Sequence, residues 1–466
     1  MGSGFLYRSL EEWIRQGIKQ KRWGTGEKLP SIRTLCTEKQ LSKATVMHAL
    51  QRLEAQGLVE ARPKAGYFVK YKPEAVTTPS ITTEIKAPRT VNSGDLLLDI
   101  MQRSAAFDLC PDPTGEQQSQ GIIELNRCIG RALREPRGGR HQYYGDPAGS
   151  EILRAQLSQH YARRGLFQTL DDFCITSGCQ HALFLALMAC CKAGDTVAVE
   201  SPGFYGALQL LEQLKLKVVE IPSSPATGMD IESLEKVLQR WHVKACIVSP
   251  AFATPSGSLM PSGAKEQLIQ LANKYDLAVI EDDIYADTAL GAMPDPLKAI
   301  DTENRVILCS SFSKSLSRDL RLGWISGGRW HSEISRLKLV TQLSSSFAIQ
   351  EGVARFMAEG RFLSHQRRQR NLLQTNRDQL IAELQNWNCD VKYSVPEGGL
   401  AIWVEFPKEV DTLNHYHELL AQEIVITPGT LFSITNKYKN CLRLSFCHSW
   451  NEQRKNALDM LPAVLV

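Results

Sequence analysis

The 466-residue chain has no long hydrophobic run, and no apolar segment approaches the roughly 18 residues that a membrane-spanning helix needs. Residues 1–10 have no long apolar stretch followed by a small-residue cleavage site, so they do not indicate export. The 12 cysteines are scattered and include no C-x-x-C pair. This distribution fits neither a disulfide framework nor a zinc site. We therefore expect a cytoplasmic protein without a metal site, in which most cysteines are buried small hydrophobic residues.

The net charge is also small, at +4, but it is unevenly distributed. Residues 1–70 contain 13 lysines and arginines against 6 aspartates and glutamates, a local net charge of +7. A basic excess in a small N-terminal unit favours nucleic acid as a partner, although a solvated face is the commoner reason for such a bias. The length of the chain exceeds what one hydrophobic core usually organises, so we expect a small domain followed by a large two-lobed one.

Residues 1–72 have the pattern of three short helices and a β-hairpin. Apolar residues recur at helical spacing over 6–21, Ser31 begins a second helix, and Ser42 is a suitable N-cap for a third. Residues 58–62 and 67–69 alternate about a Pro-Lys-Ala-Gly turn, which predicts a hairpin wing. This order of elements is typical of a winged helix-turn-helix, whose third helix enters the major groove of DNA.

The residues that we expect to contact DNA come from the second helix, the third helix and the wing. They are Arg33, Ser42, Lys43, Thr45, His48, Arg62, Lys64 and Tyr67. The alternative interpretation is a small helical bundle that only docks on the rest of the chain. The strings KLPSIR at 28–33, SKATV at 42–46 and GLV at 57–59 resemble the winged helix of GntR-type regulators. This resemblance implies binding to double-stranded operator DNA.

Residues 73–100 are rich in proline, threonine, serine and lysine and show little periodicity, which predicts a linker before a domain over 101–466. In that domain, strand-like runs alternate with helical patterns. The runs are 196–199, 217–221, 245–248, 277–280 and 305–308. Such alternation predicts an α/β fold with a mainly parallel sheet covered by helices. Ligands of such sheets bind beyond the carboxyl ends of the strands.

Polar residues near these strand ends match the requirements of a pyridoxal 5'-phosphate site. Such a site needs an amine, a carboxylate beside the pyridine nitrogen, and an anion cradle for the phosphate. Lys314 could supply the amine because burial lowers the pKa of a lysine, Asp282 could keep the ring nitrogen protonated, and Tyr285 could hydrogen-bond the ring phenolate. We expect these three residues to be catalytic as well as cofactor-binding. The expected phosphate cradle consists of a helix N-terminus and flanking side chains, namely Gly178, Cys179, Gln180, Ser311, Ser313 and Arg321.

Over residues from about 140 to 450 this pattern resembles the fold type I aminotransferases, and the whole chain resembles the MocR-type regulators of the GntR superfamily. The resemblance implies a fold type I domain with a mainly parallel sheet and a smaller α+β C-terminal lobe at about 345–466. It also implies a homodimer in which Tyr144 reaches the phosphate bound by the partner subunit. By the same resemblance, Arg443 would bind a substrate carboxylate and Phe204 would stack on the cofactor ring.

The chain departs from the family pattern at positions that tune the cofactor. Thr254 stands where the family usually has asparagine, so a hydrogen bond to the ring phenolate would be lost or mediated by water. Phe204 replaces a common tyrosine and keeps only the stacking. Arg318 and Asp319 replace a frequent Pro-Gly pair, which adds a carboxylate near an anion site. These departures argue against efficient turnover but not against cofactor binding.

Taken together, the sequence predicts a DNA-binding transcription regulator that senses an amino acid or amine through aldimine exchange at Lys314. The alternative is a catalytically active aminotransferase that carries a DNA-binding domain, and the sequence does not separate the two. A serine acyl-enzyme is a third interpretation, because Ser311 and Lys314 match the S-x-x-K pattern. We reject it because no Lys-Thr-Gly follows and because it leaves the spacing of the other polar residues unexplained.

Overall fold

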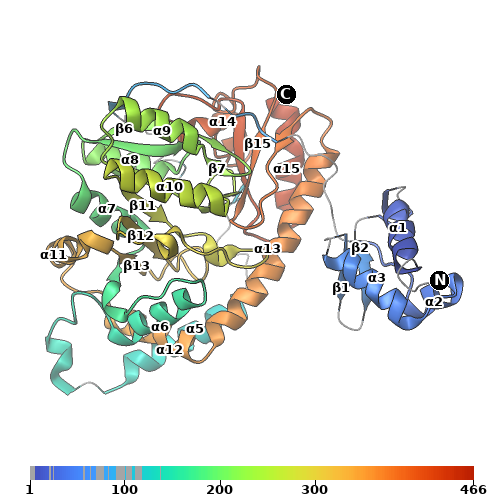
Figure 1. Ribbon diagram of the computed structural model, residues 1–466, viewed down its shortest axis with the longest axis horizontal. Coiled ribbons are helices and arrows are strands. Elements are labelled where there is room, and N and C mark those ends of the chain that lie inside the picture. Colours follow the sequence, from blue (N-terminus) through green and yellow to red (C-terminus); the bar gives the residue numbers. More distant parts are fainter. Residues whose placement is uncertain are drawn as a thin grey trace. The chain divides into compact units, whose positions relative to one another are not determined.

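The computed structural model describes residues 6–19, 22–24, 26–55, 58–62, 65–69, 78–81, 83–90, 100, 108–110, 118–136 and 138–466. The chain divides into two compact units, Met1–Val76 and Thr77–Val466 (Figure 1). No helix within the described ranges is long and apolar enough to cross a membrane. The 12 cysteines are all free thiols, eight of them buried and four half-buried.

The N-terminal unit contains the three helices and the wing that the sequence predicts. They are α1 (Leu6–Lys19), α2 (Ile32–Lys39), α3 (Lys43–Ala55) and the antiparallel strands β1 (Val59–Arg62) and β2 (Gly66–Val69). The hydroxyl of Ser31 accepts a hydrogen bond from the Thr34 amide at 3.1 Å, and that of Ser42 accepts one from the Thr45 amide at 3.2 Å. Both serines therefore cap helices, because they satisfy backbone donors that have no partner inside the helix.

One apolar cluster holds this unit together. Its buried members are Leu10, Ile14, Leu29, Leu35, Val46, Ala49, Leu50, Leu53, Leu58, Val59 and Val69. Four of them come from α3, at positions 46, 49, 50 and 53, which lie on one face of the helix. Burial of that face leaves the opposite face of α3 exposed to solvent.

The larger unit is built on one mixed sheet. Its strands are β3 (Arg89–Thr90), β4 (Cys174–Thr176), β5 (Thr196–Ser201), β6 (Lys217–Ser224), β7 (Gly228–Met229), β8 (Ala245–Val248), β11 (Ala278–Asp282), β12 (Val306–Ser311) and β13 (Gly323–Ser326). The order is β3-β6-β5-β8-β11-β12-β13-β4, and β7 pairs with β6. The strands from β6 to β12 run parallel, whereas β13 and β3 are antiparallel to their neighbours. The predicted mainly parallel sheet is confirmed.

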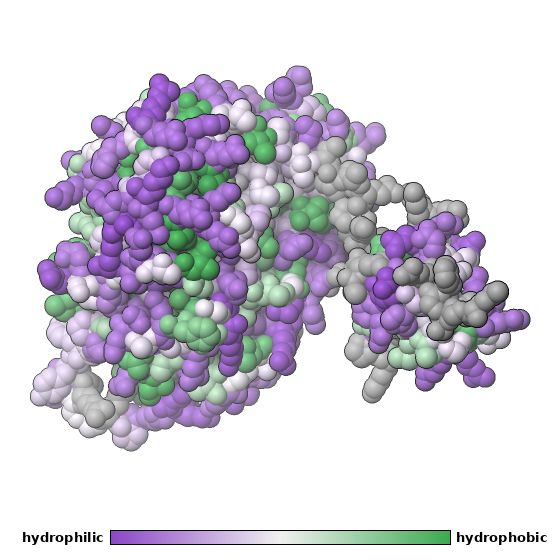
Figure 2. Space-filling model, in the orientation of Figure 1, coloured by the Kyte–Doolittle hydropathy of each residue, from purple (hydrophilic) through white to green (hydrophobic). Residues whose placement is uncertain are grey.

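Helices cover both faces of this sheet (Figure 1). They are α5 (Gln120–Arg134), α6 (Glu151–Ala162), α7 (Cys179–Cys190), α8 (Tyr205–Gln213), α9 (Ile231–Arg240), α10 (Ser262–Tyr275), α11 (His331–Thr341), α12 (Phe347–Ala358) and α13 (Arg361–Asn386). Successive side chains of a strand point to opposite faces, so Val197 of β5 packs in the cluster that includes α7 and α8. Its neighbour Ala198 packs in the cluster that includes α9 and α10. Figure 2 shows that the visible outer face of this unit is largely polar, with apolar residues in scattered groups.

A smaller C-terminal lobe with its own sheet follows α13, in agreement with the fold that the family resemblance implies. It contains the antiparallel strands β14 (Lys392–Tyr393), β15 (Ala401–Glu405) and β16 (Cys441–Ser445) and the helices α14 (Tyr416–Leu420) and α15 (Glu452–Leu465). Trp403 of β15 and Phe432 pack against Tyr205 at the start of α8. This contact joins the small lobe to the large one.

The segment 73–100, which the composition indicates to be a linker, packs in part on the larger unit. Arg89 of β3 pairs with Val218 of β6 at the edge of the sheet. The backbone and the hydroxyl of Ser80 both donate hydrogen bonds to the carboxylate of Glu405, and Ile85 packs against the core. Composition does not reveal this packing, because a two-residue edge strand is too short to show a periodicity.

The core of the N-terminal unit leads to a stability prediction. We expect Leu50→Ala to lower the free energy of unfolding of this unit by about 2–5 kcal/mol, because it leaves a cavity among fully buried side chains. Hydrogen exchange followed by mass spectrometry should show faster exchange in α1 and α3 and unchanged exchange in β11 and β12. The exposed neighbour Gln51→Ala is the matched control. Equal protection in the two variants would contradict the assigned core.

Candidate functional site

The carboxyl ends of β11 and β12 bring several of the predicted site residues together. Asp282 is the last residue of β11 and Ser311 is the last residue of β12, so both strands extend beyond the runs predicted from apolar residues. Asp282 lies beside Cys309 in the parallel pairing of the two strands. Lys314 follows β12 by three residues, and Lys314 and Asp282 each influence the pKa of the other.

Asp282 is a buried carboxyl group that accepts a hydrogen bond from a thiol. Its Oδ1 atom lies 3.3 Å from the Cys179 Sγ atom at the start of α7. Burial raises the pKa of Asp282 to about 6, and the hydrogen bond from Cys179 opposes this shift. Burial also raises the pKa of Cys179 well above its ordinary value, so the thiol stays protonated and donates. A buried carboxylate is stabilised by a cationic partner, and a protonated pyridine nitrogen is one.

Lys314 has the properties of a nucleophilic amine. Desolvation, together with the nearby guanidinium groups of Arg318 and Arg443, lowers the pKa of Lys314 to about 7. Its Nζ atom lies 5.9 Å from the centre of the Tyr285 ring. A large fraction of this amine is therefore neutral near pH 7, which imine formation requires.

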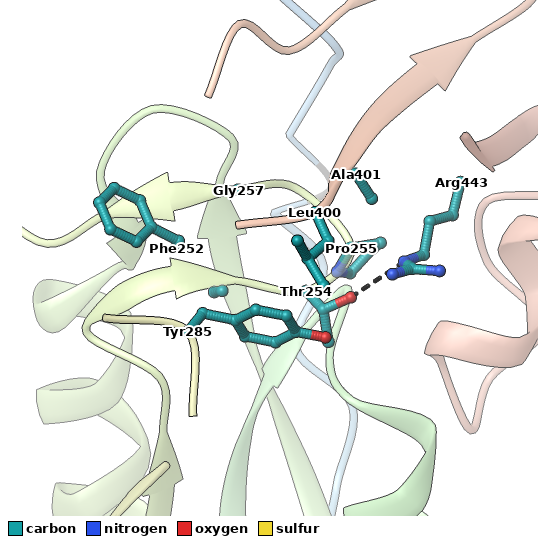
Figure 3. A pocket seen from close by; sticks show the side chains of 9 residues that line it. Phe252, Thr254, Pro255, Gly257, Tyr285, Leu400, Ala401 and Arg443 are labelled. Carbon is teal, nitrogen blue, oxygen red and sulfur yellow. Dashed lines mark hydrogen bonds between the residues drawn. The ribbon is translucent and has the colours of Figure 1, made fainter. Parts of the chain in front are cut away.

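Tyr285, Thr254 and Arg443 line a small pocket between the two lobes of the larger unit (Figure 3). Arg443 is buried on β16, and its Nε atom donates a hydrogen bond of 3.2 Å to the Thr254 hydroxyl. Figure 3 shows the Tyr285 hydroxyl directed toward the side chain of Thr254. Burial raises the pKa of Tyr285 to about 12, so its hydroxyl remains protonated and can donate a hydrogen bond. Thr254, which is shorter than the asparagine expected from the family resemblance, thus holds Arg443 in position through this hydrogen bond.

The beginning of α7 has the geometry of an anion-binding site. Gly178 occupies the N-cap position with φ of 89°, and a Cβ atom there would lie only 2.6 Å from the Nη2 atom of Arg321. The same Nη2 atom donates to the Ser177 carbonyl oxygen at 3.2 Å. Only glycine allows both the positive φ and this close approach. Backbone amides at the helix N-terminus and one guanidinium group therefore converge where a phosphate is favourable.

The remaining cofactor candidates take different positions. Ser311 is buried, and its hydroxyl accepts a hydrogen bond from the Ser313 amide at 3.3 Å. The Gln180 side chain donates to the Gly206 carbonyl oxygen at 2.8 Å, so it ties α7 to α8. Phe204 is half-buried and lines a second pocket together with Asp282. Tyr144, by contrast, lies on the surface with 78% of its area exposed.

The donor set of this site fits pyridoxal 5'-phosphate. An amine of lowered pKa, a buried carboxyl group and a cationic helix N-terminus lie around pockets that an aromatic ring borders. These are the groups that the aldehyde, the pyridine nitrogen and the phosphate of that cofactor require. The residues of this site are therefore suited to hold pyridoxal 5'-phosphate.

Two buried acidic groups behind the site were not singled out by the sequence analysis. Asp283 forms an ion pair with Arg164, with Nη1–Oδ2 and Nη2–Oδ1 distances of 2.5 and 2.8 Å, and Tyr161 donates to the same carboxylate at 2.9 Å. Glu281 accepts hydrogen bonds from the amides of Leu297 and Lys298. Successive side chains of a strand point to opposite faces of the sheet, so the sequence could have indicated that Glu281 and Asp283 point away from the face of Asp282.

Glu200 is a third buried acid that the sequence analysis missed. It lies in β5, accepts a hydrogen bond of 2.9 Å from the Ser249 amide, and lines the pocket of Phe204 and Asp282. Burial raises the pKa of Glu200 to about 8, so its protonated form predominates at neutral pH. No residue pattern identified it, because its neighbours in sequence are ordinary strand residues.

The expected DNA contacts of the N-terminal unit are mostly exposed. Arg33, Ser42, Lys43, His48 and Arg62 are exposed, Thr45 and Tyr67 are half-buried, and Lys64 lies outside the described residues. The hydroxyls of Ser42 and Thr45 lie 2.8 Å apart within the helix cap, and the His48 ring packs edge-on against that of Tyr7. Arg62 forms an ion pair with Glu60 at 2.7 Å.

Comparison with known proteins identifies two regions of the chain. Residues 6–69 match the gntR family of bacterial regulatory proteins, and residues 115–461 match aminotransferase class I and II. YjiR of Escherichia coli K12, an uncharacterized HTH-type transcriptional regulator, is 34% identical over 98% of this chain and 97% of its own length. YdcR of the same organism, named likewise, is 32% identical over 98% of both chains.

Among solved structures, the α-aminoadipate aminotransferase LysN of Thermus thermophilus superposes with a TM-score of 0.71 and 25% identity. The superposition covers 78% of this chain and 94% of LysN, which was crystallised with N-(5'-phosphopyridoxyl)-L-leucine. The larger unit thus has the fold of class I and II aminotransferases, whose members bind pyridoxal 5'-phosphate.

The lowered pKa of Lys314 leads to a labelling prediction. In cofactor-free protein, acetylation of Lys314 should accelerate between pH 6 and 8 and then level off, because the neutral amine reacts and its pKa is about 7. Exposed lysines, with a pKa of about 10.4, should react faster with each further pH unit. Peptide mass spectrometry at a series of pH values measures both rates. A Lys314 profile parallel to that of the exposed lysines would contradict the assigned pKa.

Proposed function

Because the chain belongs to the HTH-type transcriptional regulators that join a gntR-family region to an aminotransferase class I and II region, the MocR-type architecture, we propose that it senses an amino acid or amine through pyridoxal 5'-phosphate bound at Lys314. The observation that carries this proposal is the position of Lys314, which follows the carboxyl end of β12 by three residues, while the buried Asp282 ends the adjacent parallel strand β11. Binding to DNA would also place the chain in the cytoplasm, as the sequence analysis expects.

Each part of the cofactor has a residue to bind it. Pyridoxal 5'-phosphate, when bound, supplies an aldehyde that condenses reversibly with primary amines. Lys314 would present the amine, Asp282 would keep the ring nitrogen protonated, and the Tyr285 hydroxyl would donate to the ring oxygen. The amides that follow Gly178 and the guanidinium group of Arg321 bind the phosphate.

The cofactor ring and the effector have their own contacts. Phe204 borders the pocket of Asp282 and would stack on the ring. Cys179, Gln180, Ser311 and Ser313 would contribute backbone amides and hydroxyls to the phosphate site. The effector's carboxylate is bound by Arg443, which is buried and oriented by its hydrogen bond to Thr254.

We also propose that the larger unit forms a homodimer. Tyr143 and Tyr144 are each 78% exposed and Val340 is 84% exposed, and a surface contact with a second copy accounts for such large exposed apolar groups. In this dimer Tyr144 contributes to the phosphate site of the partner subunit. An amine that takes the place of Lys314 changes how the two lobes close and thereby how the dimer presents its two winged helices to DNA.

A working aminotransferase is the second candidate. The presence of Lys314, Asp282 and Tyr285, the three residues expected to be catalytic, favours it. The buried Asp282 and the Lys314 amine would suit proton transfer as well as sensing. The two functions differ in what an amino acid does. A sensor changes its DNA affinity at one equivalent of effector, whereas an enzyme converts many equivalents and leaves its DNA affinity unchanged.

The proposal predicts the behaviour of a lysine variant. Lys314→Ala should lose the visible absorbance band of the lysine-bound cofactor, because no other amine replaces it, while the circular dichroism of the fold remains. Its affinity for duplexes selected from a random DNA library should no longer respond to amino acids. The exposed Lys192→Ala is the matched control and should keep the band and the response. An unchanged band in Lys314→Ala would place the cofactor elsewhere.

A second prediction concerns the DNA-binding surface. Affinity for a mixed-sequence duplex, measured by fluorescence anisotropy, should fall steeply with salt, and Arg33→Ala should reduce the slope of log affinity against log salt by about 1. Arg62→Ala should have a smaller effect, because Glu60 already pairs with that guanidinium group. Neither variant should alter the visible absorbance. Arg336→Ala in the larger unit is the exposed control, and a salt-independent affinity would exclude phosphate contacts.

A further inference from the structure

Arg318 reaches from the large lobe toward the small lobe beside Lys314. It lies in the connection between β12 and β13, which also carries Lys314 and Arg321. Its Nη2 atom lies 3.6 Å from the Sγ atom of Cys447, two residues beyond the end of β16. Because Arg443 is part of β16, the two lobes bring both arginines to one site.

The contact with Cys447 puts the guanidinium group of Arg318 close to the end of β16, the strand that carries Arg443, and the electrostatics agree with this position. Arg318 and Arg443 both lower the pKa of Lys314, and the effect of Arg318 is the larger. Burial raises the pKa of Tyr205, whereas Arg443 and Arg318 oppose that shift. Two positive groups from different elements therefore act on the same amine and on the same phenol. A site with this arrangement favours an anionic ligand.

The contact with Cys447 orients Arg318. The Ser445 hydroxyl donates to the Cys447 Sγ atom at 3.2 Å, so this sulfur accepts hydrogen bonds from both side chains. Burial raises the pKa of Cys447, but a hydrogen bond and the charge of His448, together with Arg318, bring it down to about 6. The 3.6 Å contact with this sulfur is longer than a guanidinium–carboxylate hydrogen bond, which is about 2.7–2.9 Å and often forms in pairs. A ligand carboxylate would therefore improve on this contact.

We propose that Arg318 binds a second acidic group of the effector, so that the effector is an acidic amino acid rather than a neutral amino acid or a simple amine. The inference rests on the proposed function and adds the effector's class to it. The α-carboxylate lies at Arg443, and the distal acidic group lies at Arg318. Arg318 is exposed, so solvent screens this contact and its contribution is a preference among amino acids.

The test compares acids with their uncharged amides of the same length. Full-length protein loaded with pyridoxal 5'-phosphate is titrated with L-glutamate and L-glutamine and with L-aspartate and L-asparagine, and both visible absorbance and DNA affinity are recorded. We expect the acid of at least one pair to bind about tenfold more tightly than its amide, or about 1.4 kcal/mol. The preference should weaken as salt is added.

Two arginine variants separate the roles of the two guanidinium groups. Arg318→Gln should reduce the affinity for the acid to that for the amide and leave the affinity for the amide unchanged. Arg443→Gln should weaken both ligands of a pair equally. The visible absorbance of each variant without amino acid shows whether it still folds and holds the cofactor. Arg318→Lys should recover part of the preference, because it keeps the charge but not the planar fork.

The outcomes distinguish this inference from the proposed function. Equal affinities for acid and amide in both pairs, or an equal loss for both ligands in Arg318→Gln, would overturn the role of Arg318. The proposed function would survive that result, because amino acids would still change the absorbance and the DNA affinity. If none of the four amino acids changed either quantity, the role of Arg318 and the sensing of α-amino acids would both be refuted.

Discussion

The low pKa of one partly buried amine is the constraint on which the site of the larger unit depends. Desolvation and two arginines lower the pKa of the Lys314 amine to about 7, whereas burial raises the pKa of the nearby Asp282. The pKa values of the amine and the carboxyl group are thus shifted toward each other, and small changes around them shift the distribution of protons. A ligand that brings negative charge to the arginines would alter that distribution. Sensing and proton transfer can thus rest on the same set of residues.

The sheet provides the rigidity that such a site needs. β11 and β12 are central strands in the sheet, and the carboxyl groups that flank Asp282 are tied to the surrounding structure. Asp283 is held by Arg164 and Tyr161, and Glu281 by two backbone amides. Removing a partner from such a buried ion pair is costly, because it leaves a charge without compensation. Behind the site, the loop that follows β11 is therefore held in place by several strong contacts, and Asp282 and Tyr285 keep their orientation.

The positive charges are distributed differently in the two units. The basic excess lies in the N-terminal unit, where exposed cationic side chains surround a compact apolar core. In the larger unit the positive groups near Lys314 converge on one site between its two lobes, with Arg318 contributed by the large lobe and Arg443 by the small lobe. Since the position of Arg318 relative to Arg443 depends on how these lobes meet, a ligand that binds both would favour one arrangement of the lobes. Such a preference is the physical link between an amino acid and DNA in the proposed function.

The sequence by itself determined the division into a DNA-binding unit and an aminotransferase-like unit, the mainly parallel sheet and the residues that begin α2, α3 and α7. These features depend on local patterns, such as the serine before α3, the apolar runs of the strands and the glycine before α7. Only the tertiary structure decided which groups hold the two acids that flank Asp282, that residues 89–90 form an edge strand, and that Arg318 meets Cys447 across 129 positions of sequence. Contacts between distant segments depend on how the elements pack, and packing is not encoded in the spacing of neighbouring residues.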